Sequence, residues 1–317
     1  MHVRPVSAGE IDPFVEAAGR TDHRSEVRQY LERMFDAGSM RPEWCFIAEE
    51  GDRPVGRVAF WTLPGMEEPF ALVLLDVVCD HVNVGTRLLE GVLPKARALG
   101  TGEIEHVIDD PPMRPQFQYH ANERIELLES LGFSLRRETS RFERRGGAPP
   151  VVPERLSFRT LPQVGEDEFV DAIEQVSEGT LDREIRAEIE KLGAESAARE
   201  FLDDAQRVQH DPTWWRLAYA PNGELAGLVI PAEPPGFLTI FYVGVVPGMR
   251  GQGYVDELLA AGTATLLDAQ SKNEKPLIAD TDVANGPMAA AFERAGWVRF
   301  AGRREYVFSL SALQHFS

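Results

Sequence analysis

The same pattern of elements occurs twice in this chain, and this internal repeat limits the fold more than any other feature of the sequence. In the first copy, an apolar run begins at Trp44, turns at a Gly-Asp pair and continues as a second apolar run through Gly56. In the second copy, Trp215 and Gly227 occupy the same places around an Asn-Gly turn. Apolar runs joined by such turns are typical of β-hairpins. The constant offset predicts two domains of one architecture.

Each copy continues with an apolar strand that leads into a long helix. In the first copy the strand is Leu72 to Val78 and the helix runs from about Gly85 to Leu99. In the second copy they are Leu238 to Val246 and about Gly253 to Ser271. Both copies then close with a strand, a helix, a Gly-aromatic pair and a strand, the last of which is Glu305 to Phe308.

A segment rich in Gly and Pro separates the two copies. It runs from position 144 to 153 and reads Arg-Arg-Gly-Gly-Ala-Pro-Pro-Val-Val-Pro. Such a composition is typical of a linker. We therefore expect a boundary near residue 150, with domains at 1–148 and 154–317, each of a common domain size.

Charge and composition limit the partners. The net charge is −18, from 33 basic and 51 acidic residues. This field repels nucleic acid and anionic membranes and attracts small cations. There is no long apolar run and no secretory leader, and Cys45 and Cys79 stand in apolar runs, as expected of buried thiols. We expect a cytoplasmic monomer or homodimer.

The stretch from Tyr242 to Leu259 carries the clearest chemical signal. It reads as a strand, the turn Arg250-Gly251-Gln252-Gly253 and the start of a helix. Glycine allows positive φ and a close approach of the backbone to a ligand. Consecutive N–H groups then point into one cup, and the helix N-terminus adds a favourable dipole. With Arg250 adding its charge, the turn predicts a pyrophosphate site. The dinucleotide and P-loop motifs are absent.

These residues resemble the acetyl-CoA signature of the GNAT superfamily of N-acetyltransferases. Seven positions fall in register, whereas Val255 departs from the usual Gly or Ala. A second element, Asn285 to Trp297, resembles the family's helix beside the pantetheine arm. The residues in register are Val245, Pro247, Arg250, Gly251, Gly253, Leu258 and Leu259.

The resemblance implies an α+β fold of two tandem GNAT-like domains, each a mixed, mostly antiparallel sheet flanked by helices. It also implies acetyl-CoA as co-substrate, with strand residues lining the acetyl arm. The layout is similar to that of mycothiol synthase, from which no substrate is carried over. The residues expected to contact the cofactor are Val243, Val245, Val246, Arg250, Gly251, Gln252, Gly253, Tyr254, Val255, Asn285, Met288 and Phe292.

The first copy lacks this signature. Aligning its Leu-Leu pair, Leu88 and Leu89, with Leu258 and Leu259 places Asp80 opposite Arg250 and Asn83 opposite Gly253. An aspartate in the place of the arginine repels a pyrophosphate. We therefore expect a degenerate N-terminal domain and a catalytic C-terminal one.

The family mechanism implies attack of a neutral amine on the thioester, helped by a base and an acid. The usual Tyr position holds Phe292, so Tyr242, Tyr254 and Tyr306 are candidate acids. Asp280 and Asp282, at the end of a strand, are candidate bases; the alternative is that they cap the next helix.

The function expected is transfer of an acetyl group from acetyl-CoA to a primary amine of a small molecule. Two alternatives stay open, a protein or peptide N-acetyltransferase and a non-catalytic sensor of acyl-CoA. The seven histidines show no metal-ligand spacing, so no metal is expected.

Overall fold

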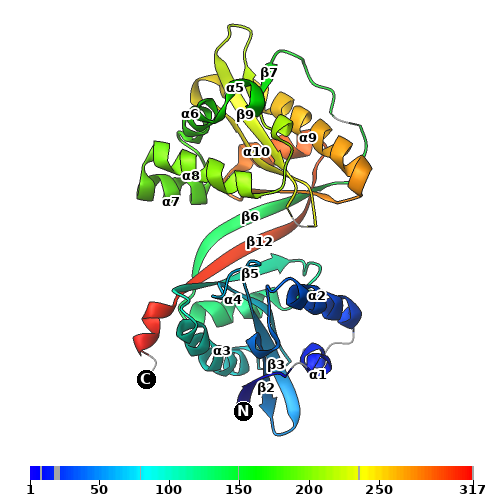
Figure 1. Cartoon of the computed structure of the whole chain (residues 1–317), viewed down its shortest axis with the longest axis vertical. Helices are drawn as coiled ribbons and strands as arrows, with labels where there is room; N and C mark the ends of the chain where they lie inside the picture. The colour runs from blue at the N-terminus through cyan, green and yellow to red at the C-terminus, as the bar shows by residue number, and fades with distance from the viewer. Residues whose placement is uncertain (8, 18–21, 79, 149, 235, 316–317) are drawn as a thin grey trace. The chain divides into compact units, whose positions relative to one another are not determined.

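The computed structural model describes residues 1–7, 9–17, 22–78, 80–148, 150–234 and 236–315. The chain forms two compact units (Figure 1). Unit 1 comprises Met1–Glu138 and Gly302–Ser317, and unit 2 comprises Thr139–Ala301. Each unit combines helices with mainly antiparallel strands, which confirms the expected α+β class. Cys79 lies outside the described residues.

Unit 1 is built on a sheet of order β1-β2-β3-β4-β5-β12, in which the β4–β5 pair is parallel and the other pairs with a known register are antiparallel. Its elements are β1 (His2–Pro5), α1 (Ile11–Glu16), α2 (Arg24–Asp36), η1 (Pro42–Trp44), β2 (Cys45–Glu50), β3 (Arg53–Trp61), β4 (Ala71–Val77), α3 (His81–Ala98), β5 (Glu103–Asp110), α4 (Ala121–Ser130), part of β6 (Ser134–Arg144), part of β12 (Val298–Ser309) and η4 (Leu310–His315).

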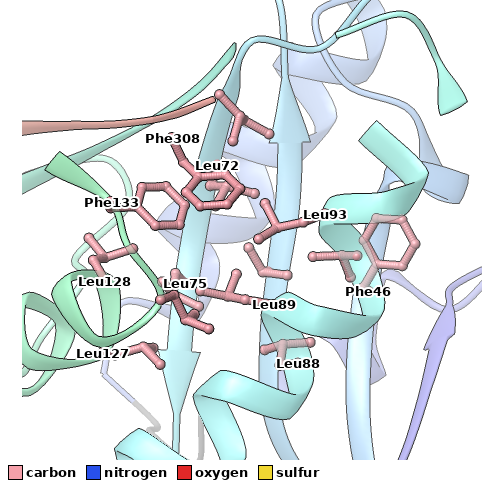
Figure 2. Close-up of a cluster of buried hydrophobic side chains, with 14 of the residues drawn as sticks. Phe46, Leu72, Leu75, Leu88, Leu89, Leu93, Leu127, Leu128, Phe133 and Phe308 are labelled. Carbon is pink, nitrogen blue, oxygen red and sulfur yellow. The ribbon is translucent and has the colours of Figure 1, made fainter. Parts of the chain in front are cut away.

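The main core of unit 1 lies between the sheet and helices α3 and α4. Apolar residues recur on α3 at helical spacing, so one face of the helix is buried. Phe133 stacks on Phe308 of β12 with ring centroids 4.9 Å apart. Figure 2 shows Leu88, Leu89 and Leu93 of α3 with Leu72 and Leu75 of β4, Leu127 and Leu128 of α4, Phe46, Phe133 and Phe308.

Unit 2 repeats this order of elements. Strands β10, β9, β8 and β7 form an antiparallel sheet, and β11 pairs with β6. The elements are β7 (Ser157–Thr160), α5 (Leu161–Val164), α6 (Glu166–Ser177), α7 (Arg183–Leu192), α8 (Ala194–Arg207), η2 (Pro212–Trp214), β8 (Arg216–Tyr219), β9 (Leu225–Ala232), β10 (Thr239–Val245), η3 (Pro247–Met249), α9 (Tyr254–Asn273), β11 (Leu277–Asp282) and α10 (Gly286–Arg294).

Side-chain caps fix where two helices of unit 2 begin. The Asp182 carboxylate accepts hydrogen bonds from the N–H groups of Glu184 and Ile185 at the start of α7. The Asn285 side chain accepts one from Met288 at the start of α10. Both caps satisfy N–H groups that have no partner within the helix.

Strands β6 and β12 each have residues in both units, and this changes the division of the chain. Tyr306 of β12 pairs with His106 of β5, and Ser140 of β6 pairs with Thr281 of β11. The strand expected to close the second domain thus belongs to unit 1. The units therefore divide the chain differently from the expected 1–148 and 154–317. The alternation of apolar and polar residues along a strand shows which face is buried. It does not show which of two similar strands is the hydrogen-bonding partner.

The long helix of unit 1 begins earlier than expected, at His81 rather than near Gly85. Helices α3 and α9 are long. No helix in the described part of the chain is both long enough and apolar enough to span a membrane.

Candidate active site

Strands β10 and β11 touch at one point and then separate. Leu238 and Leu277 form an isolated parallel bridge, in which the Leu238 N–H donates to the Pro276 carbonyl at 2.8 Å and the Ile278 N–H donates to the Leu238 carbonyl at 2.9 Å. Beyond this bridge, β10 pairs with β9 and β11 pairs with β6. An irregularity between Ile240 and Tyr242 further bends β10. In the described residues, no ladder pairing joins β10 to β11 beyond this bridge.

The glycine-rich turn lies between β10 and α9. Gly251 and Gly253 have φ values of 77° and 78°, a left-handed conformation that glycine adopts without strain. Gly253 caps α9 without any side-chain hydrogen bond. Within the described residues, no hydrogen-bond partner is found for five consecutive N–H groups, those of Gly251, Gln252, Gly253, Tyr254 and Val255. Such a row of donors at a helix N-terminus is suited to an anion.

Close packing sets the position of this turn. A Cβ atom on Gly227 of β9 would lie 2.2 Å from the Gly244 carbonyl oxygen and 3.0 Å from Leu258 Cδ1. Only glycine allows β10 and the first turns of α9 to approach β9 so closely. Gly227 is the residue that matches Gly56 in the repeat.

Arg250 binds main-chain carbonyls of its own unit. Its Nε donates to the Val245 carbonyl at 3.1 Å, and its two terminal nitrogens donate to the carbonyls of Val176, Glu178 and Gly179 at 3.1, 2.7 and 3.4 Å. The guanidinium was expected to add charge beside phosphates. In the structure it ties the turn to the C-terminal end of α6, where unpaired carbonyls favour a cation.

The acidic residues in the first turn of α9 are both paired. Asp256 accepts from Arg294 at 2.8 and 3.1 Å. Glu257 is 3% exposed and accepts from the Nε of Arg155 at 2.7 Å and from the N–H groups of Arg155 and Leu156 at 2.8 and 3.1 Å. The sequence prediction missed Arg155. It stands in a segment without periodicity, 102 residues from Glu257, and no local pattern indicates the contact.

The other expected cofactor residues of unit 2 lie on or just after β10, in the turn before α9, at the start of α9 and on α10. Val243, Val245, Val255 and Met288 are partly buried against its core, and Val246 is buried in the neighbouring cluster. The Gln252 side chain contacts the Met249 sulfur at 3.8 Å. Phe292 is 2% exposed and stacks on Phe142 with centroids 5.3 Å apart, so it fills the core beside α10.

Tyr242 lies just after the bend in β10. Its hydroxyl shares a 2.9 Å hydrogen bond with Ser177 of α6. Burial raises the pKa of Tyr242 to about 12, against a smaller lowering by the Ser177 contact. The phenol is therefore protonated at neutral pH and can serve as a proton donor.

The two other candidate tyrosines have different surroundings. The Tyr254 ring lies under the Arg155 guanidinium, with Cζ 4.7 Å from the ring centroid. Tyr306 is in unit 1, where its hydroxyl donates to Glu129 at 2.9 Å; burial, the largest cause, raises its pKa to about 12.

The candidate bases on β11 are both hydrogen bonded. Asp280 accepts from Arg141 at 3.1 Å. Asp282 is 4% exposed and accepts from the N–H groups of Ala284 at 2.8 Å and of Arg183 at 3.3 Å. Asp282 thus supports the turn before α10 and also reaches the first residue of α7.

A cavity of about 340 Å³ lies in unit 2 between α6, α7, α8 and β10. Helices α7 and α8 lie side by side there (Figure 1). Ser177, the hydrogen-bond partner of Tyr242, belongs to its wall, as does Phe241 at the bend of β10. Its apolar wall includes Ile173, Ile185, Ile189, Leu192, Phe201 and Phe241, and its acidic residues are Glu184, Glu188, Glu200 and Asp204. Lys191 also lines the cavity and is paired with Glu188.

Unit 1 has no equivalent turn in its described part. Helix α3 begins seven residues before Leu88, whereas α9 begins four residues before Leu258. The extra helical turn takes the place of the glycine-rich segment. Gly56 pairs with Val77 in unit 1, and the matching Gly227 pairs with Val245 in unit 2. Val77 therefore corresponds to Val245, and two residues earlier Leu75 corresponds to Val243. The Leu75 N–H donates to the Gln118 side chain at 2.8 Å.

A buried polar network adds to this difference. Arg57 and Asp76 form an ion pair of 2.7 Å at positions that match Leu228 and Gly244 of unit 2. His106 donates through Nδ1 to the Leu72 carbonyl and accepts from Arg124 through Nε2. Burial, reinforced by the Arg124 charge, lowers the pKa of His106 to about 3.

No protein-family model matches the sequence, and no curated protein matches it. Solved structures match its fold. A GCN5-related N-acetyltransferase from Sphaerobacter thermophilus is 16% identical, with a TM-score of 0.60 over 98% of this chain and 95% of that one. A glucosamine N-acetyltransferase region of a fungal multi-domain GH3 β-N-acetylglucosaminidase is 14% identical, with a TM-score of 0.52 over 97% and 38% of the two chains.

These likenesses confirm the fold that the glycine-rich turn predicted: the chain has the fold of the GNAT N-acetyltransferases, present in two units. In the described residues, no group of His, Cys, Asp and Glu side chains is arranged to hold a metal ion.

Proposed function

We propose that the chain is an acetyl-CoA-dependent N-acetyltransferase that acts on the primary amine of a small molecule, with the reaction in unit 2. The row of five N–H groups from Gly251 to Val255 carries this proposal. It stands at a helix N-terminus, beside two parting strands, as a pyrophosphate ligand requires. The residues present therefore fit acetyl-CoA as co-substrate.

The amine nitrogen attacks the thioester carbonyl carbon, the C–S bond breaks, and the amine loses a proton. We assign Tyr242 as the donor that protonates the leaving thiolate, because it neighbours Val243 on β10, the strand expected to line the acetyl arm, and its phenol is protonated at neutral pH. For the amine proton we assign Asp282 rather than Asp280. Asp280 pairs with the charged guanidinium of Arg141, whereas Asp282 accepts from the main-chain N–H groups of Ala284 and of Arg183 at the start of α7. Main-chain donors of β10 orient the acetyl carbonyl.

The cavity between α6, α7, α8 and β10 is the acceptor site in this proposal. Its volume, about 340 Å³, suits a small molecule. Its apolar wall and its acidic residues, which outnumber Lys191 by four to one, suit an amine with an apolar body. A peptide substrate, the first alternative, would need an extended groove instead.

The second alternative is a sensor that binds acyl-CoA without turnover. The apolar Phe292 in the core, where the family usually has a tyrosine, favours it. Turnover separates the sensor from the enzyme.

Cofactor binding is tested by calorimetric titration of acetyl-CoA into the full chain and two matched variants. Gly253→Glu puts a carboxylate into the row of donors at a residue with φ of 78°, and it should abolish binding. Gly248→Glu adds the same charge at an exposed position where a Cβ meets nothing within 4 Å, and it should bind nearly as well as the wild type. Absence of binding to the wild type would refute the proposal.

Turnover is then tested by release of CoA thiol with three acceptor groups: apolar primary amines, acidic amines such as amino acids, and peptides. Apolar amines should react fastest. Reaction with peptides alone would support the protein acetyltransferase, and binding without any thiol release would support the sensor.

A further inference from the structure

We propose that Arg155 is a phosphate ligand of unit 2, in direct contact with the pyrophosphate of CoA. The inference rests on the proposed function, because it adds a residue to the same cofactor site. Arg155 precedes β7 and comes from the segment that joins the two halves of the sequence.

The position of Arg155 is fixed by a buried carboxylate. Glu257 receives three hydrogen bonds from this segment, two from main-chain N–H groups and one from the Arg155 Nε. The carboxylate is 3% exposed, while the Arg155 side chain is 39% exposed. One end of the side chain is thus held inside the protein and the other reaches solvent. An ion pair of this kind holds the guanidinium in place before a ligand arrives, which lowers the entropy cost of binding.

The guanidinium lies directly at the glycine-rich turn. Nη1 donates to the Gln252 carbonyl at 3.0 Å, and Cζ lies 4.7 Å from the Tyr254 ring centroid. A Cβ on Gly253 would lie 3.6 Å from Nη2. Among the described residues, Nη2 has no acceptor. Its two N–H bonds therefore remain available beside the unpartnered main-chain donors of the turn.

The other two arginines near the turn are already engaged. All three guanidinium nitrogens of Arg250 donate to main-chain carbonyls, and Arg294 is paired with Asp256. Arg155 also has a carboxylate partner, but it retains a nitrogen directed at the turn. The planar guanidinium can donate to a carboxylate on one edge and to a phosphate on another.

The test compares Arg155→Gln with Arg159→Gln. Arg159 is the matched control. It is in β7, and its guanidinium also lies over a tyrosine ring, with Cζ 4.9 Å from the Tyr219 ring centroid. A double variant, Arg155→Gln with Glu257→Gln, removes the buried charge that the single variant leaves unpaired. The readouts are calorimetric affinity for CoA, for dephospho-CoA, which lacks the 3′-phosphate, and for pantetheine, which lacks all phosphates.

We expect both Arg155 variants to bind CoA about 10- to 100-fold more weakly, to lose the same factor with dephospho-CoA, and to bind pantetheine as the wild type does. Arg159→Gln should bind all three normally. Equal loss with pantetheine would assign Arg155 a purely structural role, and a loss with CoA but not dephospho-CoA would place it at the 3′-phosphate; either result overturns the inference. If the wild type binds no CoA, the proposed function itself fails. If it binds and Arg155→Gln binds equally, this inference alone fails.

Discussion

The main-chain N–H of Leu75 donates a 2.8 Å hydrogen bond to the side-chain oxygen of Gln118, and both groups are buried within unit 1. By strand register, Leu75 matches Val243, which we expect to line the acetyl arm in unit 2. Unit 1 therefore satisfies this main-chain donor with its own side chain, whereas in the proposed function the matching donor of unit 2 faces the acetyl arm.

We expect one acetyl-CoA per chain in the wild type and also in Gln118→Ala, because the start of α3 takes the place of the glycine-rich turn in unit 1. The variant should also lose about 1–3 kcal/mol of unfolding free energy, because a buried N–H is left without an acceptor. Calorimetry gives the stoichiometry and urea unfolding the stability. Gln116→Ala is the matched control in the same loop, where a half-buried side chain contacts the Tyr30 hydroxyl at 3.3 Å, and its loss should be smaller. A second CoA site in Gln118→Ala would contradict the prediction.

Arg250→Lys separates two roles of this residue. A lysine keeps the positive charge but cannot donate to four carbonyls in a fixed geometry. If Arg250 acts by tying the turn to α6, the lysine variant should bind acetyl-CoA about tenfold more weakly and show faster amide hydrogen exchange over residues 174–182. Wild-type affinity and exchange in Arg250→Lys would show that charge alone matters, as the sequence suggested.

Tyr242→Phe tests the proton donor. Loss of the phenol should lower kcat by about 10²-fold and leave the KM for acetyl-CoA almost unchanged, because the ring still packs in place. Since the pKa of Tyr242 is raised to about 12, the donor form persists to high pH. The wild type should therefore show no fall in kcat attributable to this group until the pH approaches about 12.

The matched control is Tyr219→Phe, which removes a hydroxyl that donates to Glu168 on another part of unit 2. Its kcat should equal that of the wild type. Equal rates in Tyr242→Phe would assign proton transfer to another group.

The local elements were predictable from the sequence because each has a local cause. The hairpin after Trp215 follows from two apolar runs and an Asn-Gly turn, and the structure places β8 and β9 there. The glycine-rich turn was predicted from the Arg-Gly-Gln-Gly sequence between an apolar strand and a helix, and Gly251 and Gly253 have positive φ in the structure. The repeat predicted the same hairpin and the following strand and helix in unit 1, and only the start of α3 differs from that prediction.

The long-range features were not predictable. The pairing of β12 with β5 and of β6 with β11 depends on a choice between similar strands. The Arg155–Glu257 and Gln118–Leu75 contacts join single residues from loops to distant elements, and no periodicity marks them. The carbonyl contacts of Arg250 depend on where α6 ends in space.

Acid should destabilise unit 1 through His106. The pKa of this histidine is lowered to about 3 in the folded chain, first by burial and then by the Arg124 charge, while an unfolded histidine titrates near its ordinary value of about 6.5. The folded state therefore binds fewer protons below about pH 6.5. Stability is fully present above that pH and falls as the pH drops toward about 3, by up to about 1.4 kcal/mol per pH unit.

His106→Gln should remove this slope. A glutamine amide can donate to the Leu72 carbonyl and accept from Arg124, as the imidazole does, but it does not titrate. Urea unfolding at about pH 7 and about pH 4.5 should therefore show a smaller stability loss in His106→Gln than in the wild type. His2→Gln, at an exposed residue of β1, is the control and should keep the wild-type slope. Parallel pH dependence in wild type and His106→Gln would mean that other groups cause the acid sensitivity.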